Sequence, residues 1–423
     1  MTYTETLAYL YTRLPMFQRQ GAAAYKANLD NTLALCEALD NPQHKFKSIH
    51  IAGTNGKGST SSMLAAIFQT AGYKTGLYTS PHLNSFTEKI CINGAEISEA
   101  AVILFTEKNT AIIEKISPSF FEVCVAMAFD YFAQEKVDIA IIEVGLGGRL
   151  DSTNVILPEL SVITNISYDH TDLLGDTLAK IAYEKAGIIK PNIPVVIGET
   201  YEETAAVFIE KAAAENSPIF FADQLHTAEL ISQDIWKQEI LVLPENEAFC
   251  LDLPGNYQQH NLLTVLQAVS LLASTWHISQ AHIRTALSQV KQLTGLRGRM
   301  LCLQTEPTVI CDTGHNEAGI RAVIPQIEAF CTGKLHIVWG MVKEKNHEKV
   351  LCLLPKYASY YFVCPDIPRG LPAAEMQTKA ADFQLLGGKY ESVKDGLQAA
   401  LLAAKKEDLV FVGGSTFVVA EVV

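Results

Sequence analysis

Short apolar runs alternate with longer amphipathic segments along the first two thirds of the chain. The runs are rich in β-branched residues and lack polar interruptions, which is typical of strands buried on both faces of a sheet. We expect strands at residues 48–51, 74–78, 139–144, 160–165 and 194–197, and helices at 59–71, 122–134 and 177–189. This order of elements predicts βαβ units and a mostly parallel sheet.

A second alternation of the same kind follows the glycine and arginine cluster at 295–299. Strands are expected at 308–311, 335–339, 360–364 and 409–412, with a helix at 392–405. The less regular segment 223–256 favours a few antiparallel strands, and helices are expected after it at 258–275 and 279–292. We therefore predict an α/β fold with a larger domain over 1–296 and a smaller C-terminal α/β domain over 297–423.

Composition and charge narrow the class of protein. The 423 residues are 48% hydrophobic and 19% charged, which is ordinary globular usage, and no run approaches the roughly 18 apolar residues that span a bilayer. A net charge of -13 argues against binding to nucleic acid, which relies on clustered Lys and Arg. The N-terminal residues 1–14 lack a signal sequence, and the nine scattered cysteines fit a reducing compartment, so we expect a cytoplasmic protein without membrane segments.

A glycine-rich loop between the first strand and its helix is the strongest local motif. It comprises Gly53, Thr54, Asn55, Gly56, Lys57, Gly58 and Ser59. Such a loop lets backbone N–H groups approach phosphate oxygens at a helix N-terminus, where a lysine and a hydroxyl assist. The loop departs from the strict nucleotide-loop pattern at two positions: Ile51 replaces the first glycine, and Gly58 separates Lys57 from Ser59. We interpret it as a P-loop-type phosphate site; the alternative is a glycine-rich turn capped by Ser59.

Polar side chains follow two further strands. Glu143 ends the strand at 139–144, at the carboxyl edge where ligands bind in open α/β sheets, and its oxygens suit Mg²⁺. His170 follows the next strand within the sequence Asp-His-Thr, and we favour a metal-ligand role for it over that of a core histidine. Lys185 lies in a helical segment and is ambiguous from composition alone, since most such lysines face water.

Taken together, these motifs resemble the folylpolyglutamate synthases, often bifunctional with dihydrofolate synthase, within the Mur ligase family of ATP-dependent amino-acid ligases. The resemblance runs over nearly the whole chain. It is carried by residues 53–59, 78–83, 121–122, 143–154, 169–171, 184–187, 295–299 and 312–316.

The resemblance implies a set of residue roles. Lys57 and the backbone of 53–59 would hold ATP phosphates, and Asn261, Arg299 and Asp312 would contact the nucleotide. Two Mg²⁺ sites would take ligands from Ser59, Ser80, Glu143 and His170. Lys57, Lys185 and His170 would serve catalysis, with Lys185 carbamylated. The pterin end of the substrate would contact residues 24–26, Ser119, Phe121, Asp151 and Ser152.

The reaction that the resemblance implies is ATP-dependent addition of L-glutamate to reduced folates and to dihydropteroate through an acyl phosphate. Small-molecule partners and a monomer are expected. Two alternatives stay open: a Mur-type ligase acting on another carboxylate substrate, and a nucleotide-gated binding module that makes no amide.

Overall fold

The computed structural model describes residues 1–16 and 28–423, and the chain forms two compact units. The first unit comprises 1–228, 242–249 and 259–295, and the second comprises 229–241, 250–258 and 296–423. Residues 229–241 and 250–258 therefore belong to the second unit. The sequence predicts instead a single division at 296, with both segments in the first domain. One reason is local: the hydroxyl of Tyr257 donates a hydrogen bond to Asp312 of the second unit, at 2.8 Å.

The first unit is built on an eight-stranded sheet of order β4-β3-β2-β5-β1-β6-β7-β8. Its strands are β1 (Lys47–Ala52), β2 (Thr75–Tyr78), β3 (Ile90–Ile92), β4 (Ala95–Glu96), β5 (Ile139–Glu143), β6 (Leu160–Ile163), β7 (Val195–Ile197) and β8 (Ile219–Phe221). The strands from β2 to β8 in this order pair in parallel, whereas β3 and β4 add an antiparallel edge. The predicted mostly parallel sheet is confirmed.

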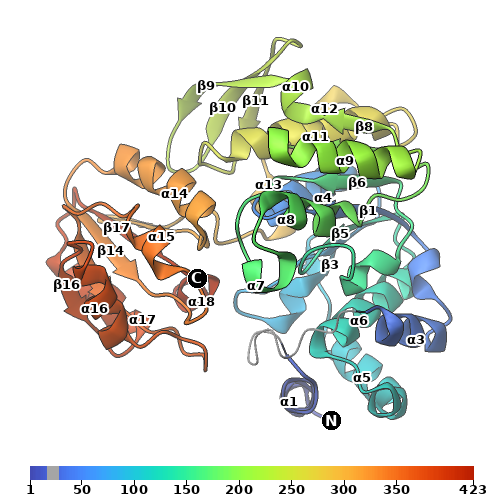
Figure 1. Ribbon diagram of the computed structural model, residues 1–423, viewed down its shortest axis with the longest axis horizontal. Coiled ribbons are helices and arrows are strands. Elements are labelled where there is room, and N and C mark those ends of the chain that lie inside the picture. The colour runs from blue at the N-terminus through green and yellow to red at the C-terminus, as the bar shows by residue number, and fades with distance from the viewer. Residues whose placement is uncertain (17–27) are drawn as a thin grey trace. The chain divides into compact units, whose positions relative to one another are not determined.

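Helices surround this sheet, which lies in the blue-to-yellow part of Figure 1. They are α1 (Tyr3–Arg13), α3 (Asp30–Ala38), α4 (Lys57–Thr70), α5 (Glu99–Ile116), α6 (Phe120–Gln134), α7 (Thr171–Leu174), α8 (Leu178–Ala186), α9 (Glu202–Ala214) and α10 (Ala222–Leu225), with short 3-10 turns η2 (Pro42–His44), η3 (Phe86–Lys89) and η4 (Ser152–Val155). Strands β1, β2, β5 and β6 are buried along almost their whole length, as expected for a sheet covered on both faces.

The irregular segment of the sequence forms a separate three-stranded sheet of order β11-β10-β9. Its strands are β9 (Thr227–Gln233), β10 (Gln238–Leu243) and β11 (Glu247–Leu251). They precede α11 (Gln258–Leu272), α12 (Gln280–Leu287) and α13 (Val290–Thr294). The helix predicted over 279–292 is therefore two helices, because Gln289 leaves the helical conformation with φ -141° and ψ 26°.

The part of the second unit at 296–423, orange to red in Figure 1, holds a six-stranded sheet of order β12-β13-β17-β14-β15-β16. Its elements are β12 (Leu301–Thr305), β13 (Thr308–Cys311), α14 (Glu317–Phe330), β14 (Leu335–Trp339), α15 (His347–Leu351), β15 (Ser359–Phe362), α16 (Ala373–Ala381), β16 (Gly387–Lys389), α17 (Val393–Ala403), β17 (Leu409–Gly413) and α18 (Thr416–Ala420). Only the β12 edge is antiparallel. The predicted smaller α/β fold is confirmed.

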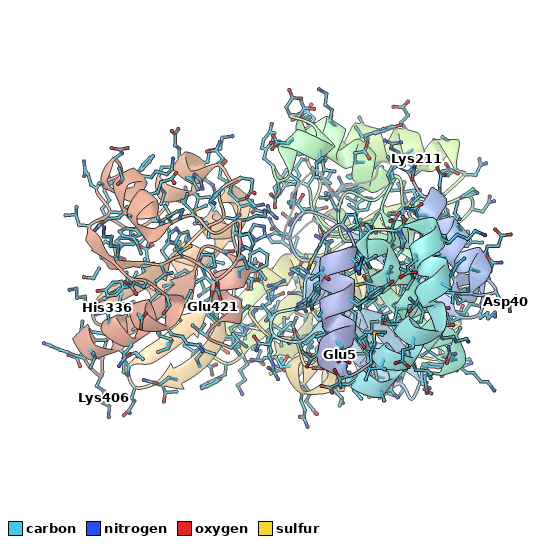
Figure 2. All side chains as sticks on the ribbon, turned by 90° about the horizontal axis from the view of Figure 1, so that it is seen from below. Glu5, Asp40, Lys211, His336, Lys406 and Glu421 are labelled. Carbon is cyan, nitrogen blue, oxygen red and sulfur yellow. The ribbon has the colours of Figure 1, made fainter. Side chains whose placement is uncertain are left out.

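Charged side chains are distributed over the surface of both units. Figure 2 shows Asp40, Lys211 and Lys406 at the periphery, and the side chains of Asp40 and Lys406 are 91% and 74% exposed. His336, also labelled there, is an exception, since it is buried at the start of β14 beside the hydroxyl of Tyr361. The sheets therefore have apolar interiors, and charged side chains lie at the periphery.

Candidate active site

The loop between β1 and α4 has a conformation that only glycine permits at two positions. Gly53 and Gly56 have φ of +143° and +84°. A Cβ at Gly53 would lie 1.8 Å from the hydroxyl of Thr164, and one at Gly56 would lie 2.2 Å from the side-chain oxygen of Asn261. The loop is therefore packed tightly against the end of β6 and against α11, which places Asn261 beside the predicted phosphate loop.

The end of β6 also holds the loop through hydrogen bonds. The amide of Thr54 donates to the Asn165 carbonyl at 2.9 Å, and the amide of Asn55 donates to the Asn165 side chain at 3.0 Å. Beyond the loop, α4 begins at Lys57 and continues for 14 residues, with Ser59 buried in its first turn. The positive end of this helix and its N–H groups favour an anion at the loop.

Two lysine side chains meet at the carbonyl oxygen of Gly53. Lys57 Nζ donates to the carbonyls of Gly53 and Thr54, both at 3.1 Å, and Lys185 Nζ from α8 donates to Gly53 at 2.8 Å. Lys185 is buried, and its burial lowers the pKa to about 7, with the charge of Lys57 acting in the same direction. Asp169 and Asp151 oppose this shift. Lys185 is thus part of the loop's surroundings rather than a surface lysine.

Glu143 lies at the same edge of the sheet as the loop. It pairs in register with Ile51 of β1, and Tyr78 of β2 pairs with Ile142. The Glu143 carboxylate is buried and accepts a hydrogen bond from the amide of Ser80 at 3.4 Å. The structure thus brings Ser80 and Glu143 together, as the candidate metal ligands require.

His170 lies at the start of α7, in a left-handed conformation with φ +50°. Its backbone amide donates to the carboxylate of Asp169 at 2.9 Å, and its Nε2 is 3.9 Å from the same carboxylate. The charge of Asp169, next to His170 in the sequence, also favours the protonated form of Lys185. No group of three or more His, Cys, Asp or Glu residues within 1–16 and 28–423 is arranged to hold a metal ion.

Two of the candidate substrate residues flank Gly145, directly after β5. A Cβ at this glycine would lie 2.4 Å from the Phe121 ring and 3.2 Å from Asp151. Ser119 is the N-cap of α6, where its hydroxyl accepts from the amide of Glu122, and Ser152 is buried in η4. Phe121 and Asp151 therefore lie together, whereas Ser119 has a capping role of its own. Residues 24–26 lie outside the described residues.

Arg299 and Asp312 belong to the second unit. Asp312 is buried and accepts hydrogen bonds from the Tyr257 hydroxyl and the Met300 amide, both at 2.8 Å, and from the Gly314 amide at 2.7 Å. Arg299 donates to the carbonyl of Gly298 at 3.2 Å. The pKa of Tyr257 is well above its usual value because of burial and the nearby Asp312 charge, so this tyrosine stays a neutral donor.

Two buried polar residues near the site, Lys89 and Tyr78, have no role assigned from the sequence. Lys89 is buried, and burial lowers its pKa while Cys124, Glu143 and Glu88 act against the shift. Tyr78 is fully buried, and its hydroxyl has no hydrogen-bond partner within the described part of the chain. Lys89 precedes the apolar run 90–92 of β3, which is the only sequence signal that marks it.

Two family domains match the chain. The Mur ligase middle domain matches residues 51–269, and the Mur ligase glutamate ligase domain matches 298–416. The chain belongs to the Mur ligase family. The family resemblance predicted from the loop and strand-end motifs is confirmed.

Individual relatives within the Mur ligase family cover the chain almost completely. Folylpolyglutamate synthase of Lacticaseibacillus casei is 32% identical over 96% of this chain and 93% of its own length. Dihydrofolate synthase/folylpolyglutamate synthase of Bacillus subtilis is 31% identical over 99% and 98%. The solved structure of E. coli FolC in complex with DHPP and ADP has a TM-score of 0.86 at 30% identity, covering 100% of this chain and 97% of that chain. The predicted group of ATP-dependent folate ligases is confirmed.

Within the described ranges, none of the helices combines the length and apolar character that a bilayer crossing needs.

His50 of β1 gives the first unit a testable response to acid. It is fully buried, and burial lowers its pKa to about 3, with Lys190 acting in the same direction. The unfolded chain protonates this histidine near pH 6.5 whereas the folded chain does not, so stability falls as the pH drops below that value. Between about pH 7 and pH 5, His50 alone should lower the free energy of unfolding by about 2 kcal/mol.

The measurement is urea unfolding at both pH values for the wild type and for His50→Gln. The variant lacks this titration, so its loss of stability on acidification should be smaller by that amount. An identical loss in both proteins would contradict the assignment of a neutral, buried His50.

Proposed function

We propose that the chain is an ATP-dependent ligase that adds L-glutamate to reduced folates and to dihydropteroate through an acyl-phosphate intermediate. The observation that carries the proposal is the meeting of Lys57 and Lys185 at Gly53, on the sheet edge that also bears Glu143. The Bacillus subtilis relative is named for both activities, dihydrofolate synthase and folylpolyglutamate synthase, which supports the two proposed acceptors. The E. coli structure contains ADP and DHPP, which supports a nucleotide and a pteroate-type acceptor. Cytoplasmic location and a monomeric state are part of the same proposal.

ATP would bind with its phosphates at the loop 53–59. The backbone N–H groups and the positive end of α4 face this position, and Lys57 can turn from the loop carbonyls to the phosphates. Asn261, which lies against Gly56, is a proposed contact to the nucleotide. Arg299 and Asp312 keep the nucleotide roles that the family resemblance implies.

The residues at the sheet edge fit Mg²⁺. This ion takes one or two carboxylates together with phosphate oxygens and water, and does not require a cage of protein ligands. Glu143 offers a buried carboxylate next to Ser80, and Ser59 offers a hydroxyl in the first turn of α4. His170 would serve a second ion on the lysine side. When bound, the ions would neutralise charge that develops on the phosphates.

Lys185 would carry a carbamate. Its pKa of about 7 leaves much of the amine neutral near physiological pH, and only the neutral amine attacks carbon dioxide. The ammonium first loses one proton to give the neutral amine, and the amine loses a second as the new N–C bond to carbon dioxide forms, so a buried cation becomes an anion with two protons released to solvent. That anion would balance Lys57 and provide oxygen ligands where a second Mg²⁺ is proposed.

The chain's residues then perform two transfers. An oxygen of the acceptor carboxylate attacks the γ-phosphorus of ATP, ADP leaves, and Lys57 stabilises the negative charge on the transferred group. The amine of glutamate attacks the acyl carbon, loses a proton, and expels phosphate. We propose that His170, whose position is fixed by Asp169, helps to stabilise the negative charge of the transferred phosphoryl group. Burial of Glu143 and Lys185 keeps the site shielded from water.

The flat end of the acceptor would bind where Phe121 and Asp151 flank Gly145. An aromatic ring can stack on Phe121, and a carboxylate suits the N–H groups of a pterin. Ser119 and Ser152 are proposed neighbours of this position. Glutamate addition takes place at the other end of the acceptor, near Glu143 and the phosphate loop.

The proposed reaction is tested by mass spectrometry of the products. The protein is incubated with ATP, Mg²⁺ and glutamate, and with either dihydropteroate or tetrahydrofolate. We expect each acceptor to gain one glutamate or more, with ADP and phosphate formed in equal amounts. ADP formation that is indifferent to both acceptors would point to a nucleotide-gated module. Activity with a different carboxylate alone would indicate another Mur-type ligase.

Replacing Glu143→Gln should abolish amide formation while the fold is kept. The amide has nearly the same shape as the carboxylate but is a neutral and much weaker ligand for Mg²⁺. The measurements are product formation and the far-UV circular dichroism spectrum. A folded variant that retains substantial activity would show that Glu143 is not a ligand of the catalytic ion.

The carbamate can be observed directly by ¹³C NMR after equilibration with labelled bicarbonate. We expect a carbamate signal in the wild type and none in Lys185→Arg, because a guanidinium stays protonated and cannot add carbon dioxide. Lys190→Arg is the matched control and should keep the signal. A wild-type spectrum without the signal, in protein that is active, would contradict the carbamate.

A further inference from the structure

Three buried side chains form a hydrogen-bonded chain beneath the candidate acceptor position. Nε2 of His50 in β1 lies 2.9 Å from the hydroxyl of Thr153 in η4. This hydroxyl donates to Oδ1 of Asp151 at 2.5 Å, and the amide of Thr153 donates to the same oxygen at 2.9 Å. His50 and Thr153 are fully buried and Asp151 is 4% exposed.

The hydrogen bonds that join His50, Thr153 and Asp151 all run in one direction. Burial raises the pKa of Asp151, while hydrogen bonds from the amides of Leu146 and Thr153 act against this shift and stabilise the carboxylate. A carboxylate accepts hydrogen bonds, so the Thr153 hydroxyl is the donor to Oδ1. The threonine oxygen is then free to accept, and the proton between it and His50 must be on Nε2. His50 is held neutral by its burial, which lowers its pKa to about 3. The arrangement therefore selects one tautomer of a neutral imidazole.

Asp151 also holds the loop that follows β5. Its second oxygen, Oδ2, accepts from the Leu146 amide at 2.8 Å. The same oxygen would lie 3.2 Å from a Cβ at Gly145, whose other side is closed by the Phe121 ring. A displacement of Asp151 would therefore break a hydrogen bond to the backbone that lies beside Phe121.

Asp151 also acts on the phosphate side of the site. Its charge is one of two that favour the protonated form of Lys185, and Lys185 donates to the carbonyl of Gly53. Gly53 follows β1, the strand that carries His50. The hydrogen bonds of the network itself run from His50 through Thr153 and Asp151 to the Leu146 amide, on the acceptor side of the site.

We propose that His50 and Thr153 are positioning residues for the acceptor. They fix Asp151 and the backbone at Gly145 and Leu146 in the arrangement that receives the flat, hydrogen-bonding ring of a pteroyl group. Neither side chain touches the substrate. This inference rests on the proposed function, and it predicts that disruption of the network weakens acceptor binding but leaves ATP binding intact.

The kinetic test uses pairs of variants that differ in one hydrogen bond. In His50→Gln the amide nitrogen stands at the same number of bonds from Cα as Nε2, so donation to Thr153 is kept. In His50→Asn the amide is shorter and corresponds to Nδ1, so donation is lost. Thr153→Ser keeps the hydroxyl, whereas Thr153→Val removes it at nearly constant shape.

We expect His50→Asn and Thr153→Val to raise the KM for dihydropteroate about tenfold while the KM for ATP stays within about twofold. His50→Gln and Thr153→Ser should remain close to the wild type. The double variant His50→Asn/Thr153→Val should be little worse than either single one, because both break the same chain. Equal changes in both KM values, or a His50→Gln variant as poor as His50→Asn, would overturn the proposal.

Amide hydrogen exchange provides a readout that does not depend on activity. The Leu146 amide is bonded to Asp151, so peptides covering 144–150 should exchange faster in His50→Asn and Thr153→Val, and at the wild-type rate in His50→Gln. Unchanged exchange in all variants would refute the network. If the wild type makes no amide product, the proposed function fails, and exchange alone still decides whether His50 and Thr153 hold the loop.

Discussion

The carbonyl oxygen of Gly53 is the point on which the candidate site depends. It accepts hydrogen bonds from both Lys57 and Lys185. The charge of Lys57 disfavours a second positive charge on the buried Lys185, whose pKa is lowered to about 7 chiefly by its burial. Asp169 and Asp151 compensate for it in part. The arrangement therefore favours a further anion at the loop, and the phosphates of a nucleotide are anions of the right kind.

The sheet makes this meeting of charges possible. Parallel pairing of β1 with β5 and β6 brings three strand ends to one edge, so residues far apart in sequence become neighbours. The glycine conformations at 53 and 56 then let the loop pack against Thr164 and Asn261 without a side chain between them. The acceptor side is built in the same way, with Phe121 and Asp151 closing on Gly145. The fold therefore concentrates charge and excludes water at the same edge.

The sequence predicts the parts of the molecule that depend on local pattern. Continuous apolar runs reveal β1, β5 and β6, and the glycine spacing reveals the loop with Lys57. The short strands β3 and β4 were missed because three and two residues are too few to show a period. The burial of Lys185 was ambiguous, since a helix pattern does not say what packs on the helix. His50 and Thr153 are 103 positions apart, and only the folded chain shows that they touch.

The central claim is that the buried charges assist phosphoryl transfer from ATP to the carboxylate of the acceptor. The most direct measurement uses dihydropteroate whose carboxylate carries ¹⁸O. If the carboxylate attacks the γ-phosphorus, one labelled oxygen stays with phosphorus when glutamate displaces the phosphate. The account predicts one ¹⁸O in each phosphate released during amide formation. Phosphate that is free of the label while the glutamylated product forms would contradict it.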